Sequence, residues 1–184
     1  MRSVHVMITT RAAAGAVCMT VFVLLLDHSL KLVVRSQLRH CEEPALSACD
    51  HIGIGSGLHL VSTTNAGSVL GVAQGLDLWM VLALVSLLLI PLYGSRLDWR
   101  RPLIPLAVGL QAGGALSNLL DRLFGGGVVD YLAILPATLV LNLGDIALVL
   151  GALFATWEVG RGRVGTSSEP HVLVVDRISS MRGS

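Results

Sequence analysis

AAAGAVCMTVFVLLLDHSLKLVV, residues 12–34, is an apolar run that an acid and a base interrupt near its end. A helix needs about 20 mostly apolar residues to cross the hydrocarbon core of a bilayer, so this run predicts a transmembrane helix. Arg2 and Arg11 precede it, as basic residues precede the core of a signal peptide. The run is long, however, and shows no clear small-residue cleavage site, so we expect it to be retained.

Three more apolar runs are long enough to span a bilayer, at residues 76–93, 103–120 and 139–157. Hydrophobic residues make up 53% of the 184-residue chain and charged residues only 14%, against roughly 25% in soluble domains. The net charge of +1 gives no basis for nucleic-acid binding. We predict an all-α membrane protein with four transmembrane helices in one unit, residues 1–159, followed by a mobile cytoplasmic tail, residues 160–184.

The basic residues predict how the spans are oriented. Arginines gather near both termini and in the short connection at 96–101, which favours the cytoplasmic side for all three places. The loop at 35–75 and the segment at 121–138 are then expected on the outer face. Alternation at Leu58-His59-Leu60 predicts a strand or hairpin in that loop, and hence a small extracytoplasmic β-sheet region.

The cysteines give two expectations. Cys18, inside the first run, is expected to be a small buried hydrophobic residue. Cys41 and Cys49 share the outer loop, where oxidation to a disulfide is permitted. Their spacing alone does not establish the geometry of a bond, so a disulfide and two free thiols both stay open.

Asp27 and Lys31 lie four residues apart on the first predicted helix, with the acid first. This spacing and order favour an ion pair, which lowers the cost of placing both charges in a membrane. The lysine side chain could also extend toward the outer interface. We expect a structural role for the pair rather than a catalytic one.

The third apolar run ends in a polar face. Gly109 and Gly113 allow another helix to approach closely, while Asn118, Asp121 and Arg122 fall on one side of the helix near its outer end. Both a substrate-binding site and a helix end anchored by solvated charges fit this pattern.

Asp130 and Asp145 flank the last predicted re-entry into the membrane, and Asn142 shares a helical face with Asp145. If two carboxyl groups come within a few ångströms, they share a proton. One then serves as general base toward a water and the other as general acid, as in an aspartic protease. Two separately solvated acids are the alternative.

Other chemistries lack a motif. The chain has no His-Glu-x-x-His pair that would bind zinc and no Gly-x-Ser-x-Gly nucleophile turn. The histidines are scattered, and His59 is at most a weak candidate for a metal ligand or a base.

The polar motifs, taken in chain order, resemble those of the lipoprotein signal peptidases, also called signal peptidase II. They are Asp27-His28-Ser29-Leu30-Lys31, Asn65-Ala66-Gly67-Ser68-Val69-Leu70-Gly71, Gly113 to Arg122 with Gly127-Val128-Val129-Asp130-Tyr131, and Asn142-Leu143-Gly144-Asp145. Each motif is weak alone, but four in order on matching spans are specific. The likeness covers residues 12–157.

The resemblance implies an intramembrane aspartic endopeptidase of the bacterial cytoplasmic membrane. Its substrate would be a diacylglyceryl-modified prolipoprotein in the bilayer, cut before the lipid-modified cysteine at the outer face, with membrane lipids around it. No metal or organic cofactor is implied. By motif, Asp130 and Asp145 resemble the catalytic pair, and Asp27 with Lys31 a structural pair. The residues implied to bind substrate or support the catalytic pair are Asn65, Asn118, Arg122, Asn142 and Asp121.

Four positions depart from the family's pattern: His28 replaces Gln, Leu70 replaces Phe, Ser117 replaces Gly, and Gly144 replaces Ala. They leave the acids and amides in place but bear on substrate preference. The alternative function is a non-catalytic membrane protein, either a small transporter that uses the acids for ion passage or a paralogue that only binds lipidated segments.

Overall fold

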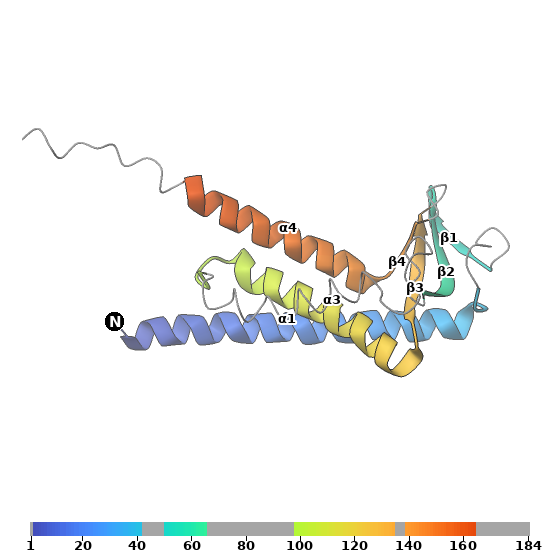
Figure 1. Ribbon diagram of the computed structural model, residues 1–184, viewed down its shortest axis with the longest axis horizontal. Coiled ribbons are helices and arrows are strands. Elements are labelled where there is room, and N and C mark those ends of the chain that lie inside the picture. The colour runs from blue at the N-terminus through green and yellow to red at the C-terminus, as the bar shows by residue number, and fades with distance from the viewer. Residues whose placement is uncertain (1, 42–49, 66–97, 135–138, 165–184) are drawn as a thin grey trace, which may run out of the picture.

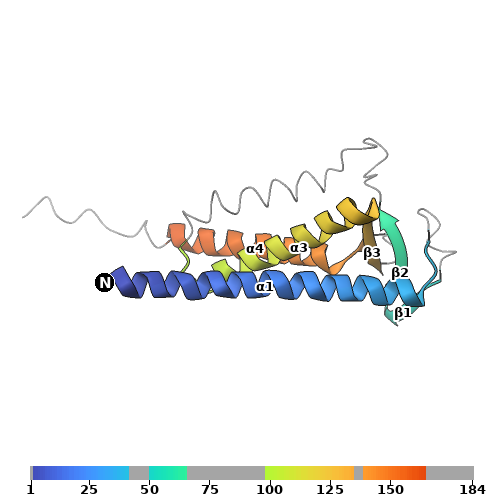
Figure 2. The same cartoon turned by 90° about the horizontal axis from the view of Figure 1, so that it is seen from below.

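The computed structural model describes residues 2–41, 50–65, 98–134 and 139–164. Among these residues, three long helices lie side by side, and a small sheet closes one end of the group (Figure 1). The helices are α1 Arg2–Gln37, α3 Leu103–Gly125 and α4 Leu143–Val164. α1 and α3 run toward the sheet and α4 runs away from it. Figure 2 shows α1 along one side of the other two helices, with α3 packed against both neighbours.

α1 buries one narrow stripe of side chains. Ala16, Val23, Asp27, Lys31 and Val34 recur at helical spacing and are all buried. Large apolar side chains on the rest of the helix are exposed, as on a helix that faces lipid. Cys18 lies on this exposed face, so the expectation that it is buried was wrong. The reason is its angular position, which falls outside the stripe that α3 covers.

Glycines set the distances between the helices. A Cβ atom at Gly109 would lie 2.6 Å from Met19 Cβ, and one at Gly113 would lie 2.7 Å from Val23 Cβ. The predicted small-residue pair therefore brings α3 close to α1. On the other side of α3, a Cβ atom at Gly114 would lie 2.3 Å from the carbonyl oxygen of Gly144 in α4.

The sheet has four antiparallel strands in the order β1-β2-β3-β4. β1 Ile52–Gly55 and β2 Leu58–Asn65 come from the loop at 35–75, where a hairpin was predicted. β3 Val128–Ile134 and β4 Leu139–Leu141 lie between α3 and α4. The small sheet expected beside the helices is therefore confirmed, and β3 and β4, which were not predicted individually, complete it.

Two boundaries differ from the predicted spans. Residues 139–157 do not form one helix, because Leu139–Leu141 pair with β3 and α4 begins only at Leu143. α4 also continues to Val164, beyond the expected end of the folded unit at residue 159. Of the described helices, Thr10–Gln37 and Leu103–Gly125 are long and apolar enough to cross a membrane. The expected span at 76–93 and the tail from residue 165 lie outside the described residues.

Candidate active site

A buried ion pair lies between α1 and α3. Lys31 Nζ is 2.5 Å from Asp27 Oδ2, and both side chains are almost fully buried. The same nitrogen is 2.7 Å from Asp121 Oδ2 on α3. The pair predicted from the four-residue spacing is confirmed. The Lys31 side chain is buried between these two carboxylates.

Asp27 accepts hydrogen bonds from the other elements of the site. Ser117 Oγ on α3 donates to its Oδ2 at 2.6 Å, and the Tyr131 hydroxyl on β3 donates to its Oδ1 at 3.0 Å. The backbone N–H of Gly144 donates to the same Oδ1 at 3.3 Å. One buried carboxylate therefore joins α1 to α3, β3 and the start of α4.

The first turn of α4 is held by side chains. The N–H of Leu143 donates to the Tyr131 hydroxyl at 3.0 Å, and the N–H of Asp145 donates to Asn142 Oδ1 at 2.9 Å. In return, the N–H of Asn142 donates to Asp145 Oδ2 at 3.1 Å. This reciprocal arrangement is a capping box, which satisfies backbone donors that a helix end leaves unpaired. It also fixes the orientation of the Asp145 carboxyl.

Asn142 contacts both acids of the predicted pair. Its side-chain Nδ2 donates to Asp130 Oδ1 at 2.6 Å, while its Oδ1 accepts the N–H of Asp145. Asn118 Nδ2 on α3 donates to Asp145 Oδ1 at 2.8 Å, and Asn118 Oδ1 accepts a hydrogen bond from Lys31 at 3.2 Å. Asp130 and Asp145 are thus held by one asparagine, although β4 and a connecting segment separate them in sequence.

The environment of Asp130 favours its protonated form. Its side chain lies on β3 and is 3% exposed. Burial, and then the nearby Asp145 charge, raise the pKa of Asp130 from 3.8 to about 7. Hydrogen bonds from Asn142 and Asn65 and the Lys31 charge lower the pKa but do not offset the rise. Near neutral pH, this carboxyl can therefore hold or release a proton.

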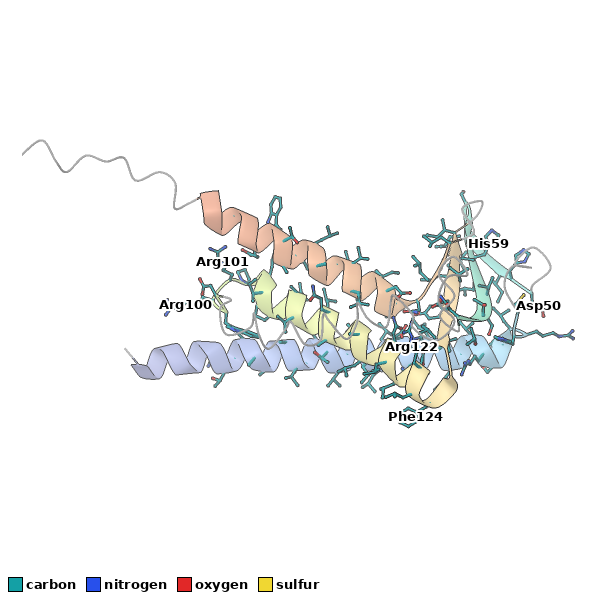
Figure 3. The ribbon with its side chains drawn as sticks, viewed as in Figure 1. Asp50, His59, Arg100, Arg101, Arg122 and Phe124 are labelled. Atoms are coloured by element: carbon teal, nitrogen blue, oxygen red, sulfur yellow. The ribbon has the colours of Figure 1, made fainter. Side chains whose placement is uncertain are left out.

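Asp121 and Arg122 lie at the same end of the helices as the acids. Asp121 pairs with Lys31, and its Oδ2 also accepts the N–H of Val129 at 3.2 Å. Arg122 Nη1 donates to the Asn118 carbonyl at 3.1 Å. Figure 3 shows Arg122 at the end that carries the sheet and Arg100 with Arg101 at the opposite end. All residues predicted for the site are thus gathered at one end of the described helices.

A model of the family described as Signal peptidase (SPase) II matches residues 19–160. The chain belongs to the signal peptidase II family. It is 34% identical over 143 residues to the lipoprotein signal peptidase of Moorella thermoacetica, covering 77% of this chain and 89% of that one. It is 36% identical over 135 residues to the lipoprotein signal peptidase of Halothermothrix orenii, covering 71% and 84%.

Solved structures share the fold. A bacterial membrane enzyme determined by the in meso method at 2.3 Å resolution matches with a TM-score of 0.69 and 18% identity, covering 85% of this chain and 94% of that one. A second, at 1.9 Å resolution, matches with a TM-score of 0.61. This signal peptidase II family member therefore keeps the fold at low sequence identity.

The sequence did not predict that Tyr131 would connect two parts of this site in the signal peptidase II family member. Its hydroxyl donates to Asp27 and accepts from Leu143, so it links the central ion pair to the first turn of α4. The signal was a tyrosine directly after Asp130 in an apolar strand, since buried tyrosine hydroxyls usually have a partner. Among the described residues, no group of three or more His, Cys, Asp and Glu side chains is placed to hold a metal ion.

Proposed function

We propose that this protein is an intramembrane aspartic endopeptidase that removes the signal peptide of prolipoproteins before the lipid-modified cysteine, with Asp130 and Asp145 as the catalytic pair. Family membership supports the peptidase activity and the class of substrate. The observation that carries the assignment of the pair is the double contact of Asn142, which bonds the carboxyl of Asp130 and the backbone of Asp145.

The chemistry needs one proton shared between two carboxyl groups. The raised pKa of Asp130, about 7, supports a singly protonated pair near neutral pH. The carboxylate takes a proton from a water as the water oxygen attacks the scissile carbonyl carbon. The carboxylic acid gives its proton to the carbonyl oxygen, so the tetrahedral intermediate carries two hydroxyl groups. As the C–N bond breaks, the first carboxyl passes the proton that it took from water to the amine nitrogen, and one hydroxyl returns a proton to the second carboxylate, which restores the singly protonated pair.

The surrounding residues have supporting roles in this proposal. Asn142 and Asn65 orient Asp130, and Asn118 orients Asp145. Arg122 lies beside Asn118 and is suited to bind the substrate. Asp121 holds Lys31, and Lys31 with Asp27 fixes the helices on which the catalytic pair depends. No step uses a metal or an organic cofactor.

The proposed topology has four spans, with residues 76–93 as the second and both termini in the cytoplasm. The polar end of the helices then lies at the outer face, next to the sheet. The lipid-modified substrate would enter sideways from the bilayer, and its scissile bond would meet water at the interface. Residues 1–164 would form the peptidase unit, because α4 ends at Val164.

Cleavage of a lipobox reporter tests the proposal. Asp130→Asn and Asp145→Asn should each abolish processing while membrane insertion is unchanged. Asp50→Asn is the matched control, because Asp50 is exposed and its nearest described ionic contact is Arg39 Nε at 3.8 Å. Retained cleavage in either site variant rejects the catalytic pair. If the wild type cleaves no reporter but carries an ion flux that these two variants lose, the protein is a transporter instead.

A further inference from the structure

Thr63 on β2 carries a hydroxyl that no residue described by the structure bonds. The residue is 0% exposed, and its Oγ1 atom has no hydrogen-bond partner there. Buried polar atoms are satisfied in the large majority of cases, so an unpaired hydroxyl next to a proposed active site requires an explanation.

Thr63 is the register partner of Asp130. In the antiparallel pairing of β2 and β3, its Cα lies opposite that of Asp130. Directly opposite residues point to the same face of a sheet, with Cβ atoms about 4.5–5.5 Å apart. Asn65, two residues further along β2, points to that face too, and its side chain is hydrogen-bonded to Asp130. The Thr63 hydroxyl therefore lies on the face that carries the acid.

The burial of Oγ1 excludes a partner that arrives from solvent. The atom exposes less than 1 Å², so neither bulk water nor an entering peptide touches it where it lies. The strand around it is held on both sides, by β3 and by a bridge to Cys41, whose N–H donates to the Ser62 carbonyl at 2.7 Å. A turn about χ1 between staggered positions moves the hydroxyl without moving the strand.

We propose that Thr63 is a positioning residue, whose hydroxyl turns about χ1 and donates a hydrogen bond to the Asp130 carboxylate. The inference rests on the proposed catalytic role of Asp130. Asn142 approaches that carboxylate from the start of α4, whereas Thr63 approaches from β2. With Asn65 as a further donor, the carboxylate is held from two elements and keeps one orientation while its proton moves.

A hydrogen bond to the charged form of an acid lowers its pKa, so the hydroxyl has a measurable effect on Asp130. Within the described ranges, the other charged groups around the site come from three helices and are unchanged by a substitution on β2. They are Asp27 and Lys31 of α1, Asp121 and Arg122 of α3, and Asp145 of α4.

An infrared titration of the full-length protein in detergent reads this effect without requiring activity. The carboxylic C=O band that Asp130→Asn removes is followed against pH in the wild type and in Thr63→Val, which has nearly the same shape but no hydroxyl. We expect Thr63→Val to raise the midpoint of the Asp130 titration by about one pH unit, and Thr63→Ser to return this midpoint to the wild-type value. Thr64→Val is the matched control, because Thr64 lies on the opposite face of the same strand, and its midpoint should stay at the wild-type value.

An unchanged midpoint in Thr63→Val, or a midpoint in Thr63→Ser as high as in Thr63→Val, overturns the proposal. Cleavage of a diacylglyceryl lipobox peptide gives the second readout. We expect Thr63→Val to lower kcat about tenfold or more with little change in KM, and Thr63→Ser to recover it. A rise in KM alone contradicts a positioning role. A wild type that cleaves nothing refutes the proposed function, while the titration still decides whether the hydrogen bond exists.

Discussion

The Nδ1 atom of His28 on α1 lies 3.1 Å from the Oγ atom of Ser117 on α3. Ser117 uses its one hydroxyl proton toward Asp27, at 2.6 Å, so His28 must present Nδ1–H as the donor in this contact. These two residues are both departures from the signal peptidase II pattern, which has Gln and Gly at the two positions. The two departures therefore contact each other, and we expect their effects on stability to be coupled.

Replacing Ser117 with Ala should destabilise the protein by about 1–3 kcal/mol, because buried Asp27 loses a donor and His28 loses its acceptor. Thermal unfolding in detergent measures the loss. A double-mutant cycle with His28→Gln should give a coupling energy of about 0.5 kcal/mol or more. Ser29→Ala is the control and should be nearly neutral, since its exposed hydroxyl bonds only its own helix, at 2.7 Å. Additive losses at His28 and Ser117 would contradict the coupling.

Asp27→Asn should lower the yield of folded protein more than it lowers the activity of each folded molecule. Asp27 is 0% exposed and accepts bonds from four groups, and removing one partner of a buried ion pair costs about 3–5 kcal/mol. Lys31 keeps its contact with Asp121, which limits the loss. Active-site titration together with size-exclusion chromatography separates the two effects. A monodisperse variant with wild-type yield and no activity would show that Asp27 takes part in the chemistry.

The sequence predicted the local relationships well and the long-range ones poorly. The Asp27–Lys31 pair follows from helical spacing, and the close approach at Gly109 and Gly113 follows from residue size. The contact of Asn142 with both acids of the proposed catalytic pair could not be predicted from spacing alone, because it depends on the pairing of β3 with β4. Tyr131 shows the same limit, since its partners are distant in sequence.

The boundary at Asn142 shows why one predicted span was misplaced. Leu139–Leu141 is as apolar as the helix that follows, so hydrophobicity alone extended the span across it. What separates strand from helix is the contact of the Asn142 side chain with the N–H of Asp145, together with pairing to β3. The Asn-x-x-Asp spacing is itself a helix-capping signal, which places the start of the helix after Asn142.

Asp130→Asn should stabilise the protein, and more at pH 8 than at pH 5. The pKa of Asp130 is about 7 in the folded state against 3.8 as its ordinary value, so between these values the folded state binds more protons than the unfolded state. The free energy of unfolding therefore falls as pH rises from about 3.8 to about 7. The side chain of Asp130→Asn has no proton to lose, so the variant does not show this fall. We expect Tm at pH 8 to rise by about 2–4 °C. An equal or larger gain at pH 5 would contradict the raised pKa.

Gly114→Ala should destabilise the contact between α3 and α4 and reduce activity with it. A Cβ atom at Gly114 would lie 2.3 Å from the carbonyl oxygen of Gly144, and this backbone cannot yield without moving the first turn of α4. That turn holds Asn142 and Asp145, so separating the helices by a few tenths of an ångström disturbs the hydrogen bonds of both acids. We expect a loss of about 1–3 kcal/mol, as for other overpacked contacts, measured by thermal unfolding.

Gly15→Ala is the matched control within α1, because a Cβ atom there has no described neighbour within 4 Å. The control should gain about 0.5–1 kcal/mol from helix propensity alone. If the two variants unfold at the same temperature, the helices are not packed as closely as the glycine contact requires, and the placement of Asp145 beside Asn118 fails with it.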